Sequence, residues 1–137
     1  MSSKKLMEKV KELLEERGRK AYEVAKEEIL NEEKEYKPIR DALQYFIQEL
    51  WHNFQHPALL SLACESVGGK PEDTTLIGAA LVLLTGAADI HDDLTDQSKT
   101  KGPNQPYSAN SAETSHSLLA AHCFNLTEDF LYLSWRK

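Results

Sequence analysis

The sequence is poor in the residues that break or cross-link a chain, with only five prolines, six glycines and two cysteines among 137 residues. Cys64 and Cys123 stand far apart and lack the close spacing of zinc ligands. We interpret them as free thiols in a reducing compartment. No signal peptide is recognisable at the N-terminus, and we therefore expect a cytoplasmic protein.

The sequence also lacks an excess of basic residues, and it has no long apolar run. Lys and Arg number 16 against 22 Asp and Glu, and the net charge of −6 makes nucleic acid an unfavourable partner. The longest apolar run, residues 76–90, is too short to cross a bilayer, so we predict no membrane span. No stretch alternates apolar and polar residues with period two, which argues against a sheet.

Apolar residues instead recur at helical spacing along most of the chain. This pattern predicts an amphipathic helix from Lys4 with Gly18 as a possible break, and residues 31–37 as the connection that follows it. A second helix is expected from Pro38, with a stripe that extends to Phe54. A third helix is expected over residues 58–67, ended by Gly68 and Gly69, and a fourth from Pro71. The short connections predict an all-α, antiparallel helical bundle, with the apolar third and fourth helices at its centre.

The fourth helix ends in a cluster of carboxylates. Asp92 and Asp96 are one helical turn apart, and Asp93 lies beside them. Like charges at this spacing repel, and a helix C-terminus disfavours negative charge. A cation removes both penalties, and hard carboxylate oxygens suit Mg²⁺, which takes substrate phosphates to complete its shell. We therefore predict a magnesium site at Asp92, Asp93 and Asp96.

The words HDDLTDQSKTKG at positions 91–102 resemble the first aspartate-rich motif, DDxxD, of the trans-isoprenyl diphosphate synthases. The resemblance covers roughly residues 42–101 and includes the upstream word CESVGG. It implies that residues 1–101 are the N-terminal part of an isoprenoid-synthase-type fold. It also implies a Mg²⁺-dependent prenyltransferase, a homo- or hetero-oligomer, that elongates an allylic prenyl diphosphate with isopentenyl diphosphate.

The same resemblance implies roles for residues around the motif. Lys99 and Lys101 would hold the diphosphate, with Lys101 the better positional match. Ala87 and Ala88 occupy the positions that set product length in the family, where small side chains imply a deep channel. Close packing between helices also favours small residues, and both interpretations stay open.

Three positions depart from the family pattern. Asn53 and His56 stand where the family places Lys and Arg for isopentenyl diphosphate, and Thr85 replaces a usual His. Asn and neutral His do not supply the positive charge that binds phosphate. An alternative to the enzyme is therefore a non-catalytic helical subunit or interaction protein. A second alternative is a metal phosphohydrolase that uses His91 and Asp92 with other histidines.

The resemblance stops after Lys101. Residues 103–112 can be back-translated so that the frame starting at the third base of each codon spells KPTVFGKFG, a word that follows the motif in the family. Synonymous choice sets only the first base of each shifted codon, so we infer a frameshift near residues 102–104. We then expect residues 102–137 to be a tail unlike the family. Without a second aspartate-rich motif no catalytic set is complete, and we expect no activity from this chain.

Overall fold

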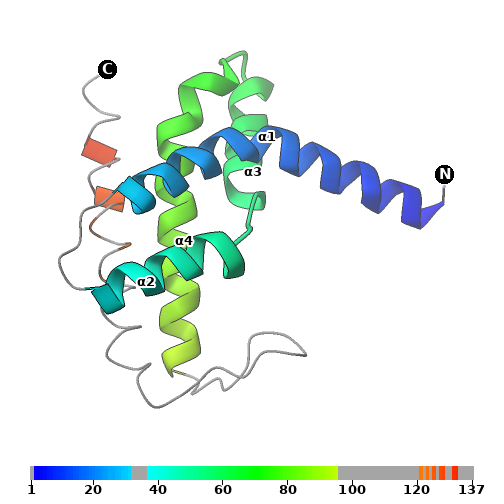
Figure 1. Cartoon of the computed structure of the whole chain (residues 1–137). Helices are drawn as coiled ribbons and strands as arrows, with labels where there is room; N and C mark the ends of the chain where they lie inside the picture. The colour runs from blue at the N-terminus through cyan, green and yellow to red at the C-terminus, as the bar shows by residue number, and fades with distance from the viewer. Residues whose placement is uncertain are drawn as a thin grey trace.

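The computed structural model describes residues 2–31 and 37–95, and the helical residues 121, 123, 125, 127, 128, 131 and 132 (Figure 1). Its elements are α1 (Ser3–Asn31), α2 (Lys37–Tyr45), the π-helical turn η1 (Phe46–Leu50), α3 (Gln55–Ser66), the 3₁₀ turn η2 (Pro71–Thr74) and α4 (Thr75–Thr95). None of the described residues forms a strand, which confirms the all-α class. α1 packs against both α3 and α4.

α1 continues through Gly18, so the possible break there does not occur. Gly18 is buried where another part of the chain passes close to the helix. A Cβ added to it would lie 2.5 Å from the carbonyl oxygen of Phe54. The glycine therefore permits a close approach between two backbones. The helix ends at Asn31, and residues 32–36 lie outside the described part of the chain.

The second helix is shorter than the apolar pattern predicts. α2 ends at Tyr45, the wider turn η1 follows, and residues 51–54 are not helical. The Trp51 N–H donates to the Phe46 carbonyl at 2.8 Å, and Trp51 itself is extended. The Tyr22 hydroxyl donates to the Ile47 carbonyl at 2.6 Å. Two carbonyl groups of η1, those of Phe46 and Ile47, therefore accept these hydrogen bonds. The chain leaves the helical conformation after η1.

α3 begins before Pro57 rather than after it. Proline lacks an N–H, which costs nothing in the first turn of a helix, so Pro57 is compatible with the helix start instead of a break. At the other end Gly68 has a φ of 85°, its N–H donates to the Glu65 carbonyl, and the Gly69 N–H donates to the Cys64 carbonyl. This is a Schellman motif, which confirms the predicted helix end.

α4 supplies much of the core, whereas α3 does not. The buried cluster combines α4 residues with residues of α1, α2 and η1, among them Tyr22, Ala25, Leu43, Phe46, Ile47, Ala79, Val82, Leu83, Ala87 and Ile90. In α3 only Pro57, Ala58 and Ser61 are buried, and Leu59 is 60% exposed. The central position expected for the third helix is therefore wrong. Its other apolar residues are half-buried or exposed.

One segment of the described residues, Pro71–Asp92, is long and apolar enough to cross a membrane by length and composition. Within the protein 44% of its apolar window is buried. Buried core helices of globular proteins meet the same criterion, so the segment's composition does not distinguish the two.

Candidate functional site

The exposed face of α4 carries apolar side chains that lead to the first carboxylate of the motif. Ile77 is 39% exposed and Leu84 is 37% exposed, and Ala88 and Asp92 are exposed as well. Their spacing of 7, 4 and 4 residues places these side chains on one side of the helix. The apolar face of α4, as we call these four residues, is thus apolar along its length and acidic at its C-terminal end.

The two alanines of the predicted chain-length pocket face different surroundings. Ala87 has no exposed surface and belongs to the core cluster. Ala88 is exposed on the apolar face of α4. Ala87 thus has the burial that close helix packing requires, and Ala88 has the exposure that a ligand contact requires.

The predicted metal and diphosphate ligands are only partly within the described residues. Asp92 is exposed in the last turns of α4, and Asp93 belongs to the same helix. Asp96, Lys99 and Lys101 lie outside the described residues. Within residues 2–31, 37–95 and the described tail positions, no three His, Cys, Asp or Glu side chains gather into a possible metal site. The magnesium site therefore stays a prediction.

The three substituted anchors lie on segments that the fold brings close together. A Cβ on Gly86, the neighbour of Thr85, would lie 3.3 Å from the Trp51 indole nitrogen, two residues before Asn53. The Asn53 side-chain oxygen accepts a hydrogen bond from the Gln55 N–H at 2.9 Å. The Thr85 hydroxyl donates to the Leu81 carbonyl at 2.7 Å. Both polar groups are thus bonded within their own segments, whereas His56 is exposed at the start of α3.

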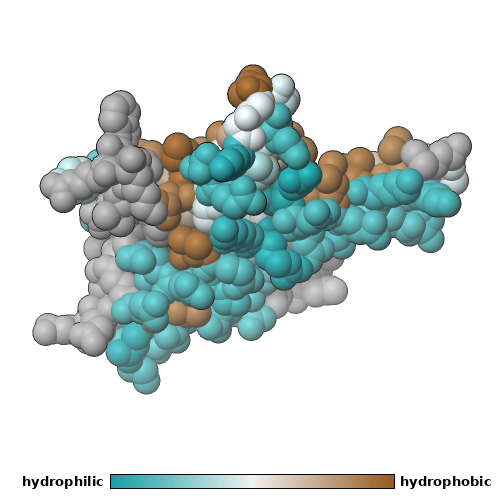
Figure 2. All heavy atoms as spheres, turned by 90° about the horizontal axis from the view of Figure 1, so that it is seen from above, coloured by the Kyte–Doolittle hydropathy of each residue, from teal (hydrophilic) through white to brown (hydrophobic). Residues whose placement is uncertain are grey.

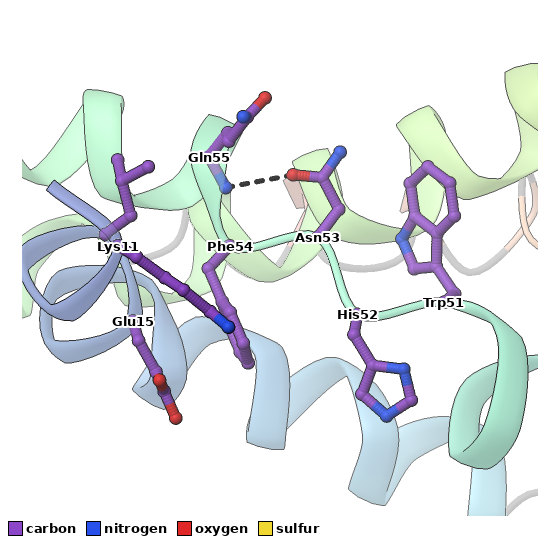
Figure 3. Close-up of a pocket in the computed structure, with 8 residues that line it drawn as sticks. Lys11, Glu15, Trp51, His52, Asn53, Phe54 and Gln55 are labelled. Carbon is purple, nitrogen blue, oxygen red and sulfur yellow. Dashed lines mark hydrogen bonds between the residues drawn. The ribbon is translucent and has the colours of Figure 1, made fainter. Parts of the chain in front are cut away.

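A cavity of about 680 Å³ lies between α1 and residues 51–55 (Figure 3). Figure 3 shows Lys11 and Glu15 on the α1 side, with Asn53 and Trp51 on the segment that passes it. The lining is completed by Leu14, His52, Phe54 and Gln55. Sequence reasoning found Asn53 here but missed Lys11 and Glu15, because no local motif indicates that α1 passes beside residues 51–55.

The histidines give no support to a phosphohydrolase site. The ring of His52 stacks on Tyr22 with 6.0 Å between centroids. Tyr22 is itself buried in the core, and burial, followed by the nearby negative charge of Glu23, raises the pKa of its hydroxyl. His56 and His91 are exposed on α3 and α4. The described residues do not bring these three histidines into a metal-binding group with Asp92.

No protein-family model matches this chain, and neither a curated protein nor a solved structure matches it. The likeness to the trans-isoprenyl diphosphate synthases therefore rests on the sequence words quoted above.

Proposed function

We propose that this chain is the N-terminal part of a protein similar to trans-isoprenyl diphosphate synthases. In this proposal the apolar face of α4 contacts the hydrocarbon of an allylic prenyl diphosphate. The aspartates at its end hold the diphosphate through Mg²⁺. The observation that carries the proposal is the course of that face, which exposes Ile77, Leu84 and Ala88 and then reaches Asp92.

A prenyl diphosphate has the same division between an apolar chain and an anionic end. Fifteen residues separate Ile77 from Asp92, which is about 22 Å along a helix. Covering exposed Ile77 and Leu84 with hydrocarbon removes apolar surface from water, at about 25 cal/mol per Å². The small side chain of Ala88 leaves room for a ligand next to the carboxylates. The hydrocarbon contact thus contributes affinity, and the acidic end fixes the orientation.

The residues at the end of α4 fit Mg²⁺ in their chemistry. The donors are carboxylate oxygens, the hard ligands that Mg²⁺ prefers, and Asp92 is exposed to an incoming ion. Asp92, Asp93 and Asp96 would hold the ion, and Lys99 and Lys101 would bind the diphosphate oxygens. When bound, Mg²⁺ would neutralise negative charge on the leaving diphosphate. The apolar face of α4 would keep water from the hydrocarbon.

The alternative of a non-catalytic subunit is supported by a different observation. The Asn53 side-chain oxygen and the Thr85 hydroxyl are bonded to backbone groups within their own segments. Neither carries the positive charge that holds a second diphosphate. Binding of the allylic ligand at Asp92 would persist, while condensation with isopentenyl diphosphate would not. The chain is then expected to bind a prenyl diphosphate without transferring it.

The binding test uses geranylgeranyl diphosphate with Mg²⁺, followed by titration calorimetry. We expect Mg²⁺-dependent binding that weakens about tenfold or more in Asp92→Ala, because a carboxylate ligand is lost. Asp73→Ala is the matched control, since Asp73 is an exposed carboxylate at the opposite end of the same helical segment, in η2. Equal affinity in the wild type and Asp92→Ala would rule out the site.

A second experiment separates the enzyme from the subunit. The coding frame is restored near codon 102, and incorporation of labelled isopentenyl diphosphate into a prenyl product is measured. If the protein is an enzyme, the restored chain should elongate the allylic diphosphate, and Asp92→Ala should abolish this activity. If the protein is a non-catalytic subunit, the restored chain should fold but remain inactive. Asn53→Lys together with His56→Arg should then produce activity, because the two substitutions supply the missing positive charges. A restored frame that yields a sequence unlike the family would refute the frameshift.

A further inference from the structure

The cavity between α1 and residues 51–55 lies where the N-terminal half of α1 begins to project from the other helices (Figure 1). Polar residues follow one edge of this half-helix and apolar residues the other (Figure 2). The helix contacts the segment at Gly18, where an added Cβ would lie 2.5 Å from the Phe54 carbonyl oxygen. Lys11 is seven residues earlier, so it lies on the same side of α1 and about 10 Å along the helix from this contact. The cavity is therefore open between the two segments beyond their contact.

The described lining of the cavity has one ammonium group, on Lys11, and one carboxylate, on Glu15. The two residues are one helical turn apart, but Glu15 pairs with Arg19 instead of Lys11. Lys11 itself forms no ion pair within the described residues. The guanidinium group of Arg19 also lies 5.9 Å from the centre of the Phe54 ring. The charge of Lys11 is thus uncompensated at the cavity, which favours a ligand with a negative charge.

The wall opposite α1 is largely aromatic, and core residues hold its rings in place. Trp51 stacks on buried Phe46 with 5.8 Å between the ring centroids. Phe54 contacts buried Tyr22 edge-on with 5.1 Å between the centroids. Trp51 and Phe54 are both only partly buried. A preformed apolar surface of this kind binds a flat apolar group without rearrangement of the protein.

Asn53 adds a hydrogen-bond donor to the aromatic wall. Its side-chain oxygen accepts the Gln55 N–H at 2.9 Å, which fixes the orientation of the amide. The NH₂ group of Asn53 points away from that bond (Figure 3). It is therefore available to an acceptor on a ligand. The lining thus combines a cation on the α1 side, a neutral donor on the other side, and apolar surface.

We propose that this cavity binds a small aromatic carboxylate, whose carboxylate pairs with Lys11 and whose ring lies against Trp51 and Phe54. Its volume of about 680 Å³ is within the usual range for small-molecule sites, about 300–1,000 Å³. One free ammonium group matches one negative charge. A phosphate ester carries about 1.5–2 negative charges, and the excess would lie near Glu15. The described lining includes no residue of α4, so this site differs from the one at Asp92 and does not depend on the proposed function.

The first test is an NMR titration with naphthoate, an aromatic carboxylate, in the absence of Mg²⁺. The sequence has two tryptophans, so Trp135→Phe leaves Trp51 as the source of the single indole N–H signal. We expect this signal to shift and to reach saturation as naphthoate is added. A Trp51 signal that does not shift would refute the proposal. Shifts confined to Ile77 and Leu84 would assign the ligand to the apolar face of α4 and would overturn it as well.

The second test addresses the ion pair. Lys11→Gln is expected to weaken naphthoate binding about three- to fivefold, because the pairing of an exposed cation is lost. Lys11→Arg keeps the charge and should keep the affinity. Lys9→Gln is the matched control, since Lys9 is also exposed and two residues are about 200° apart around a helix. Equal affinity in the wild type and Lys11→Gln, or an equal loss in Lys9→Gln, would count against the site. Circular dichroism should show the same helix content in all three variants.

The third test compares ligands that share the naphthalene rings but differ in charge. Naphthamide has no charge, and naphthyl phosphate has more negative charge than naphthoate. Both are expected to bind more weakly than naphthoate, the first because it cannot pair with Lys11 and the second because its excess charge lies near Glu15. Naphthamide that binds as tightly as naphthoate would show that the rings alone account for binding. Tighter binding of naphthyl phosphate would overturn the assignment to carboxylates.

Discussion

Gly18 offers a direct test of the packing between α1 and the segment of residues 51–54. In an exposed helix interior, Gly→Ala stabilises a protein by about 1 kcal/mol. At Gly18 the added Cβ would lie 2.5 Å from the Phe54 carbonyl oxygen and 2.9 Å from its Cβ. These atoms belong to the backbone or are fixed to it, so they move only if the segment moves. Overpacking of this kind costs about 1–3 kcal/mol.

Movement of the segment also disturbs the edge-on contact of Phe54 with Tyr22, whose centroids are 5.1 Å apart. An aromatic pair contributes about 0.5–1.5 kcal/mol beyond its buried area. We therefore expect Gly18→Ala to lower the free energy of unfolding by about 1–3 kcal/mol in urea titrations followed by circular dichroism. Gly69→Ala is the comparison and should cost less, because its Cβ would meet first the side-chain sulfur of Cys64, which can rotate, while the Cys64 carbonyl oxygen is 3.1 Å away. A Gly18→Ala protein as stable as the wild type would refute the close contact.

Further changes probe the core and the bond that holds η1. Leu83→Ala should lower the free energy of unfolding by about 2.5–5 kcal/mol because Leu83 is fully buried, whereas Leu59→Ala at a 60% exposed position should change it by less than about 0.5 kcal/mol. Tyr22→Phe should cost about 1–2 kcal/mol, because the buried Ile47 carbonyl loses its donor. Burial raises the pKa of Tyr22 above 10.0, so its stabilising effect is complete below pH 10 and is lost as the pH rises through the folded-state pKa. Alkaline titration of the urea midpoint should therefore fall less steeply in Tyr22→Phe than in the wild type.

The sequence predicted those helix boundaries that local chemistry determines. Gly68 and Gly69 end α3 because a residue with positive φ closes a Schellman motif, and Pro71 opens the next helical segment through η2. Boundaries set by distant contacts were missed. The second helix ends early next to the Ile47 carbonyl, which accepts a hydrogen bond from Tyr22 of α1, and Gly18 lies within α1 where residue Phe54 comes close.

The candidate site also has features that the sequence predicted and features that it did not. The apolar run and its terminal Asp92 follow from helical spacing, and the structure places Asp92 at an exposed position. The different surroundings of Ala87 and Ala88 could not be predicted, because only the packing of the helices decides which of two adjacent residues in α4 is buried. The cavity beside Lys11 was missed for a similar reason. Its walls come from segments about 40 residues apart in the sequence.

α4 has a buried side and a partly exposed apolar side. Ala79, Leu83, Ala87 and Ile90 are buried against the other helices, and these positions account for one side of α4. Ile77, Leu84 and Ala88 on the other side are outside that core cluster, and Ile77 and Leu84 are 39% and 37% exposed. Lipid would account for exposed apolar residues along a helix, but not for charge next to them at Asp92. Under the proposed function, a ligand with a hydrocarbon chain and an anionic end would contact both parts of this surface, the apolar stripe first and the carboxylate of Asp92 after it.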